Sequence, residues 1–126
     1  MSEKHKATLK KANAAISARD HEGFLVHCTE DIEWTMVGDL RLKGKEAVRR
    51  WMKTAYAEPP RFKQVQAIAE GNMLVVTGQI MVRDERGKEA PHAYCDVWRF
   101  RRGKMAGLMA YVVKTKVNPK RGRGSA

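Results

Sequence analysis

Five alternate residues near the C-terminal end of the chain have side chains suited to binding a ligand and moving a proton. They are His92, Tyr94, Asp96, Trp98 and Phe100. Because side chains of a β-strand alternate between its two faces, all five would share one face. An apolar setting disfavours the charged carboxylate and raises its pKa. Asp96 would then act as a general base on an activated C–H bond, or stay protonated and donate a hydrogen bond to an enolate.

Other side chains could complete such a site. Tyr94 or Tyr111 would supply a hydrogen-bond donor to a developing oxyanion. His92 would lie nearer the open end of the site, as a proton relay. The residues that we expect to contact the ligand are mostly aromatic: Trp34, Met36, Trp51, Tyr56, Trp98 and Tyr111.

A structural interpretation of the same residues stays open. A strand aspartate can face a dimer interface, where Asp96 would pair with an arginine and do no chemistry. Trp51 and Tyr56 also fit ordinary core positions of a helix. Asp96 is catalytic only if its face of the strand borders a cavity.

Sequence motifs for metals and cofactors are absent. The chain has no HExxH, CxxC, GxGxxG or P-loop pattern, so we expect neither a metal nor a cofactor. Cys28 and Cys95 are too few for a disulfide framework. His27 is adjacent to Cys28, but a nucleophilic pair needs spatial proximity and an orienting group, and adjacency alone does not supply them.

The first half of the chain has mainly helical periodicity, which predicts three helices over residues 3–18, 20–28 and 45–57. Asp20 is the predicted N-cap of the second helix. Pro59 and Pro60 end the third helix, because proline cannot continue the hydrogen-bond ladder.

The remaining segments alternate with period two and indicate strands. The expected strands cover residues 32–37, 62–70, 73–83, 92–101 and 105–115. Gly78 and Gly107 lie inside strands and predict bulges or bends, which curl a sheet. The sequence therefore predicts an α+β fold, with helices packed on one face of a curved antiparallel sheet.

Composition is that of one small globular domain. The 126 residues are 43% hydrophobic and 31% charged, which excludes collagen-like and wholly disordered chains. No apolar run reaches the ~18 residues that span a bilayer, and the N-terminus lacks the apolar core of a signal peptide. We expect a domain over residues 1–116 that does not enter a membrane, in the cytoplasm.

The net charge of +11 is unevenly placed, since residues 114–126 contain five cations and no acid. Residues 117–126 cannot bury apolar area, so we expect a disordered basic tail. Such a tail can contact the phosphates of nucleic acid. No aromatic residue is interleaved with its charges, so base stacking is not available to it.

Five short sequence motifs occur together along the chain. They are Glu-Asp-Ile-Glu-Trp at 30–34, Gly-Lys-Glu-Ala-Val at 44–48, Tyr-Cys-Asp-Val-Trp-Arg-Phe at 94–100, Arg-Gly-Lys-Met at 102–105, and the segment 108–111. Over residues 5–115 the chain resembles the SnoaL-like and ketosteroid-isomerase-like branch of the nuclear transport factor two (NTF2-like) superfamily. Because this fold supports many unrelated activities, these motifs indicate fold better than function.

The resemblance implies a cone-shaped α+β barrel, in which three N-terminal helices pack in a strongly curved, mostly antiparallel sheet. It also implies an apolar pocket open at one end and a homodimer formed through the convex face. Polyketide-cyclase-type members have a catalytic aspartate in a Tyr-x-Asp phrase near the end of the last strand. The matching residues here are Tyr111, Val112 and Val113, so the cyclase mechanism cannot be transferred.

These observations lead to a small-molecule site with Asp96 and Tyr94 as its polar anchors. The expected ligand is a small apolar or aromatic compound with one polar group. If the protein is an enzyme, it is a cofactor-independent isomerase, cyclase or dehydratase that acts by proton transfer. The alternatives are a non-catalytic ligand-binding or dimerisation module, and a polyanion-binding protein that uses the basic tail.

Overall fold

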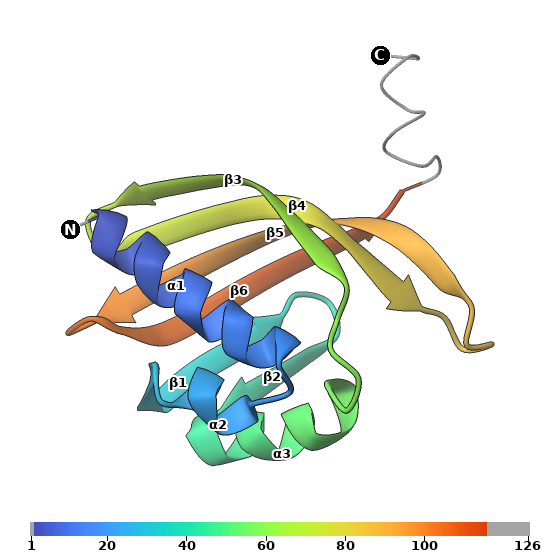
Figure 1. Cartoon of the computed structure of the whole chain (residues 1–126), viewed down its shortest axis with the longest axis horizontal. Helices are drawn as coiled ribbons and strands as arrows, with labels where there is room; N and C mark the ends of the chain where they lie inside the picture. Colours follow the sequence, from blue (N-terminus) through green and yellow to red (C-terminus); the bar gives the residue numbers. More distant parts are fainter. Residues whose placement is uncertain (1, 116–126) are drawn as a thin grey trace.

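The computed structural model describes residues 2–115 and contains three helices and six strands (Figure 1). The helices are α1 (Ser2–Ser17), α2 (His21–Leu25) and α3 (Lys45–Ala55). The strands are β1 (Cys28–Met36), β2 (Leu40–Lys43), β3 (Phe62–Glu70), β4 (Met73–Arg83), β5 (Glu89–Arg101) and β6 (Lys104–Lys114). The predicted disordered tail at 117–126 lies outside the described residues.

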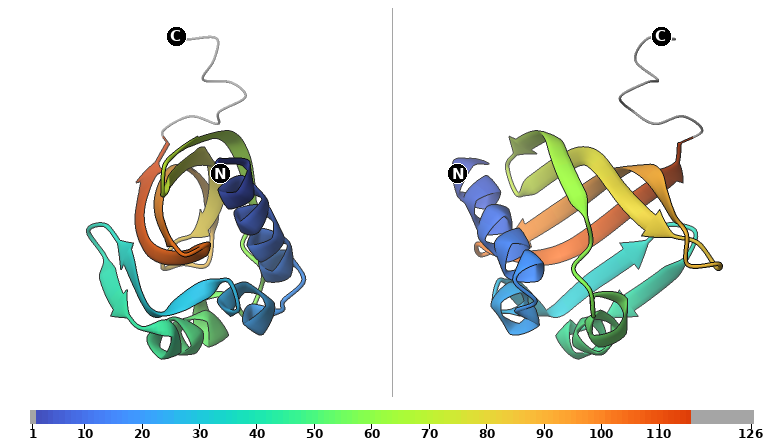
Figure 2. Two further views of the ribbon diagram at one scale, coloured as in Figure 1. Left: turned by 90° about the vertical axis from the view of Figure 1, so that its left-hand side faces the viewer. Right: turned by 45° about the vertical axis from the view of Figure 1, so that its right-hand side comes forward.

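The strands form one curved sheet in the order β2-β1-β6-β5-β4-β3. The β1–β6 pair is parallel and the other four pairs are antiparallel. The predicted α+β class and the mostly antiparallel sheet are therefore confirmed. The sheet is not closed into a barrel, because β2 and β3 are its two edges and do not pair with each other (Figure 2).

Helix α1 crosses the open side of the sheet, while α2 and α3 lie beside β1 and β2 (Figure 1). The predicted stripe of α1 is its buried face, since Leu9, Ala12 and Ile16 are at most 4% exposed. Each helix thus presents its apolar side to the concave face of the sheet, where the hydrophobic core lies.

Sequence patterns place most elements within a few residues of their observed ends. Asp20 is the N-cap of α2, and its carboxylate accepts a hydrogen bond from the Gly23 N–H at 2.9 Å. Strand β2 was not predicted, because four residues give a very short alternating pattern. It forms a hairpin with β1, in which Met36 is paired with Leu40.

Both glycines that predict bends lie at irregularities of the sheet. The register of β3 against β4 shifts between Gln64 and Gln66, next to Gly78. The register of β5 against β6 shifts between Arg99 and Phe100, next to Gly107. Such shifts bend a strand and increase its twist, and here they help to curl the sheet around the helices.

No helix within residues 2–115 combines the length and the hydropathy needed to cross a bilayer.

Candidate functional site

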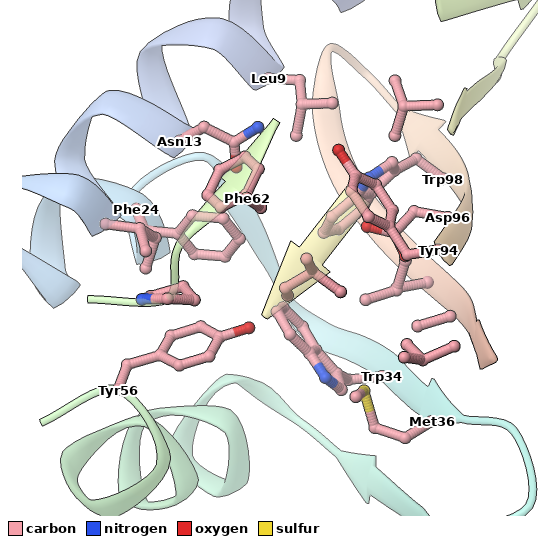
Figure 3. Close-up of a pocket in the computed structure, with 17 residues that line it drawn as sticks. Leu9, Asn13, Phe24, Trp34, Met36, Tyr56, Phe62, Tyr94, Asp96 and Trp98 are labelled. Atoms are coloured by element: carbon pink, nitrogen blue, oxygen red, sulfur yellow. The ribbon is translucent and has the colours of Figure 1, made fainter. Parts of the chain in front are cut away.

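A cavity of about 90 Å³ lies between the helices and the concave face of the sheet (Figure 3). We call it the inner chamber. Its lining is mostly apolar and comes from all parts of the fold: Leu9, Asn13, Ile16, Phe24, Trp34, Met36, Tyr56, Pro60, Phe62, Val76, Ile80, Tyr94, Asp96, Trp98, Leu108, Ala110 and Val112. Asp96 is the only acidic residue among them.

Strand β5 brings three of its alternate residues to this chamber. Tyr94, Asp96 and Trp98 line it together, as the period-two pattern predicts. Phe100, further along the same face, is buried outside the chamber and stacks on the ring of His5 at a centroid distance of 4.1 Å. The face of β5 that carries Asp96 therefore borders a cavity within this chain.

Asp96 is partly buried and faces apolar neighbours. The described residues offer its carboxyl group neither an ion pair nor a side-chain hydrogen bond. Burial raises the pKa of Asp96 to about 7, because removal from water disfavours the charged form. The group can therefore be protonated or ionised near neutral pH, as a general acid or base requires.

Two tyrosines of the chamber stay protonated at that pH. Burial and, to a smaller extent, the charge of Asp96 raise the pKa of Tyr94 to about 12. The same two causes raise the pKa of Tyr56 above its usual value. The effect of Asp96 on both groups means that the carboxylate and the two phenols belong to one electrostatic cluster. Each phenol can donate a hydrogen bond to an oxygen of a ligand.

The end of helix α3 positions Tyr56. This residue is the C-cap, and the Nε2 atom of His21 lies 3.1 Å from its carbonyl oxygen. That hydrogen bond ties the end of α3 to the start of α2. The hydroxyl of Tyr56 points toward the middle of the chamber (Figure 3). Its ring packs edge-on against Trp51 at a centroid distance of 5.0 Å.

Aromatic rings form one wall of the chamber. Trp34 packs at right angles to Trp98, with ring centroids 5.8 Å apart, and Phe24 lies 5.8 Å from Trp34. Edge-to-face geometry is favourable for such pairs because the ring edge is positive and the ring face negative. The indole N–H groups of Trp34 and Trp98 are buried and have no hydrogen-bond partner among the described residues. The three rings are at most 3% exposed, so the wall is closely packed.

A second, open depression of about 950 Å³ adjoins the chamber, and we call it the outer cleft. The two spaces share six residues, which we call the neck: Met36, Tyr56, Pro60, Ile80, Ala110 and Val112. Trp51 and His92 line the outer cleft and not the inner chamber. The prediction that His92 lies nearer the open end than Asp96 agrees with this placement.

The prediction for Tyr111 is wrong. Tyr111 is 42% exposed and is paired with Cys95, whereas Ala110 and Val112 line the chamber. Since alternate residues point to opposite faces, Tyr111 lies on the convex face of the sheet and cannot reach a ligand inside. Val113 shares that outer face, so the inward position at this end of β6 belongs to Val112.

Sequence reasoning missed several residues of the chamber. Asn13 is the polar one, and it lies between Leu9 and Ile16 on the buried stripe of α1. The spacing of Leu9, Asn13 and Ile16 is i, i+4, i+7, which places the three side chains on one helical face. A polar residue within the apolar stripe of α1 was the sequence signal that could have identified Asn13 as a chamber residue.

Metal or thiol chemistry finds no support in the described part of the chain. Residues 2–115 contain no group of three or more His, Cys, Asp or Glu side chains that could hold a metal ion. Cys28 is fully buried, and burial raises the pKa of its thiol to about 12. A thiol in that state is a poor nucleophile.

Comparison with known proteins agrees with this architecture. Residues 9–108 match the family model of the SnoaL-like domain. The chain belongs to the SnoaL-like domain family. The predicted resemblance to the NTF2-like superfamily is thereby confirmed.

Solved structures of other proteins superpose on most of this chain. An NTF2-like protein of unknown function from Cytophaga hutchinsonii is 25% identical, with a TM-score of 0.71 over 85% of this chain and 97% of that chain. An LEH-like epoxide hydrolase of M. tuberculosis is 12% identical, with a TM-score of 0.77 over 88% of this chain and 84% of that one.

TerC, co-crystallised with polyporic acid, is 21% identical, with a TM-score of 0.74 over 85% of this chain and 89% of that chain. None of the curated proteins compared with the chain matches it. At 12% and 21% identity, the epoxide hydrolase and TerC show a common fold and do not assign a reaction.

Proposed function

We propose that this SnoaL-like protein binds a small carbonyl compound in the inner chamber and catalyses a cofactor-independent proton transfer, as an isomerase or lyase does. One observation carries the proposal: Asp96, a carboxyl group with a pKa of about 7, lies in an apolar chamber with two protonated phenols. A base is most effective when its pKa is close to the working pH.

The reaction starts with ionised Asp96, whose carboxylate removes a proton from the carbon next to the carbonyl group. The C–H electron pair moves into the carbonyl, and the oxygen becomes an enolate. Tyr56 is the donor that we assign to this oxygen, because its hydroxyl points to the middle of the chamber (Figure 3). Asp96 then returns the proton to another carbon in an isomerisation, or to a leaving hydroxyl group in an elimination.

The buried aromatic wall supports this chemistry. Electrostatic interactions are stronger where water is excluded, so a hydrogen bond from a phenol O–H to an enolate oxygen is more stabilising there than in solvent. The buried rings of Trp34, Trp98 and Phe24 shield one side of the chamber from solvent. Co-crystallisation of TerC with polyporic acid and the name of the epoxide hydrolase agree with a small-molecule site in this fold.

The direct test is exchange of carbon-bound hydrogen. Benzylacetone in D₂O is incubated with the protein, and loss of the signals of hydrogens next to its carbonyl is followed by proton NMR. We expect protein-dependent exchange that falls about a hundredfold or more in Asp96→Asn. Asp31→Asn is the matched control, because Asp31 pairs with Arg101 on the surface. Saturable binding without exchange would favour a non-catalytic ligand-binding module.

We also propose that a second copy of the chain covers the convex face of the sheet. This face carries exposed apolar residues on two strands, Ile68 on β3 and Met109, Tyr111 and Val113 on β6. The half-buried Val75 of β4 and Val97 of β5 lie between them. An apolar surface that spans several strands is unusual on a monomer and is typical of an interface. The inner chamber opens elsewhere, so dimerisation would leave it accessible.

A further inference from the structure

The shapes of the inner chamber and the outer cleft restrict what kind of ligand fits. The chamber, at about 90 Å³, is smaller than the ~150 Å³ cavity that holds one benzene molecule. The outer cleft, at about 950 Å³, is far larger and joins the chamber at the neck. A ligand that reaches Asp96 therefore has a narrow head inside the chamber, and any larger part of it lies in the cleft.

Charges at the cleft make it unsuited to an anion. Its two guanidinium groups are both paired, Arg61 with Glu89 and Arg83 with Glu58. Asp39 adds a further negative charge to the lining. A carboxylate or phosphate would meet no unpaired cation among the described residues that line the cleft, and would lose its hydration. The part of the ligand in the cleft is thus not an anion.

His92 supplies a polar contact within the cleft. Its Nδ1 atom lies 3.0 Å from the carbonyl oxygen of Ala90. A carbonyl can only accept a hydrogen bond, so Nδ1 carries the hydrogen. In the neutral ring the other nitrogen, Nε2, is then an acceptor. No residue within 2–115 donates a hydrogen bond to it, so it can receive one from a ligand hydroxyl.

The strand itself sets the spacing between the two polar contacts. Asp96 and His92 are four residues apart on the same face of β5, which is no more than roughly 13 Å along the strand. The polar groups of a ligand that reaches both residues are then separated by no more than about this spacing of roughly 13 Å.

From these observations we infer that the substrate is an elongated molecule without a negative charge, with a narrow carbonyl-bearing head for Asp96 and a hydroxyl group at its other end for His92. This inference rests on the proposed function for the role of the head, and it adds the ligand class and a specificity role for His92. The connecting body is apolar, because the neck is lined by Met36, Pro60, Ile80 and Val112.

Raspberry ketone and benzylacetone form a matched pair of probes for this inference. Both have a methyl ketone at the end of a two-carbon arm on a benzene ring, and only raspberry ketone has a para hydroxyl group. Isothermal titration calorimetry of the full chain should show that raspberry ketone binds roughly threefold to tenfold more tightly, the usual effect of one neutral hydrogen bond. The para-carboxylate analogue should bind more weakly than either.

Two variants test whether His92 causes the preference for raspberry ketone over benzylacetone. In His92→Phe the ratio of the two affinities should fall to about one. His27→Phe, the same change at a histidine that lines neither space, should keep the ratio of the native protein. The inference is overturned if the native protein binds both ketones equally, or if the preference for raspberry ketone survives in His92→Phe. It is also overturned if the carboxylate binds more tightly than either ketone, or if raspberry ketone does not bind.

Binding and exchange separate this inference from the proposed function. If raspberry ketone is preferred through His92 but Asp96-dependent hydrogen exchange does not occur, the inference about the ligand stands and the proposed catalysis fails. If exchange depends on Asp96 but the hydroxyl group has no effect on affinity, the proposed catalysis stands and the role of His92 fails.

Discussion

The ring of Tyr94 lies directly over Gly78 on the neighbouring strand. The two residues are register partners on β5 and β4, and a Cβ atom at position 78 would be 2.8 Å from the tyrosine ring. It would also be 2.1 Å from the carbonyl oxygen of Lys63 on β3. Only glycine leaves room for the ring, so Gly78 both bends the strand and sets the position of a phenol in the inner chamber.

Gly78→Ala should therefore be destabilising and should displace Tyr94. We expect the free energy of unfolding to fall by about 1–3 kcal/mol, since the backbone carbonyl of Lys63 cannot move without disturbing β3. Urea denaturation measures the change. Gly38→Ala is a useful contrast, because no atom lies within 4 Å of the added carbon and the cost there comes from its positive φ of 84° alone. An unchanged stability in Gly78→Ala would contradict the packing described above.

Asp96→Asn should stabilise the protein at high pH. The pKa of Asp96 is about 7 when folded and ~3.9 when unfolded, so the folded state holds the proton more tightly. The free energy of unfolding then declines as the pH rises from about 4 to 7. An asparagine has no such loss, and we expect a gain of about 1–4 kcal/mol at pH 8 that is absent at pH 4. Denaturation at the two pH values tests this, and an equal effect at both would refute it.

The pH dependence of hydrogen exchange should identify the active form of Asp96. A general base must be ionised, so kcat/KM should rise about tenfold per pH unit below 7 and level off above it. A rate that instead falls above pH 7 would mean that the protonated carboxyl group donates a hydrogen bond. A profile without any inflection near pH 7 would remove Asp96 from the mechanism.

Tyr56→Phe should slow exchange while leaving the shape of the chamber intact. Loss of one oxyanion donor costs on the order of a hundredfold in kcat. Tyr111→Phe makes the same chemical change on the convex face, where the hydroxyl cannot reach the ligand, and it should leave the rate unaltered. Equal rates for Tyr56→Phe and the native protein would assign the donor role to Tyr94.

A charge on the convex face should separate the proposed dimer into monomers. Met109→Glu places a carboxylate among exposed apolar residues of the sheet, and burying it between two copies would be costly. Light scattering after size-exclusion chromatography reports the mass. Val26→Glu adds the same charge at an exposed position next to α2 and should not change the mass. A native chain that is already monomeric would show that this face is uncovered.

The sequence by itself was sufficient to locate most helices and strands and to predict which side chains share one face of β5. Helical and alternating patterns located three helices and five of the six strands, because apolar periodicity follows from the geometry of each element. The same alternation grouped Tyr94, Asp96 and Trp98 on one face. Strand β2 was missed because four residues give too little pattern, although the alternation of Leu40 and Leu42 with charged residues was present.

Which face borders the chamber was decided by tertiary structure alone. Period-two alternation says that Tyr111 and Val112 point in opposite directions, but it does not say which of them points inward. That choice depends on the register of β6 against β5 and on the irregularity next to Gly107. Contacts between distant parts of the chain, such as Asn13 of α1 and Asp96 of β5 on one cavity, arise only when the helices close over the curved sheet.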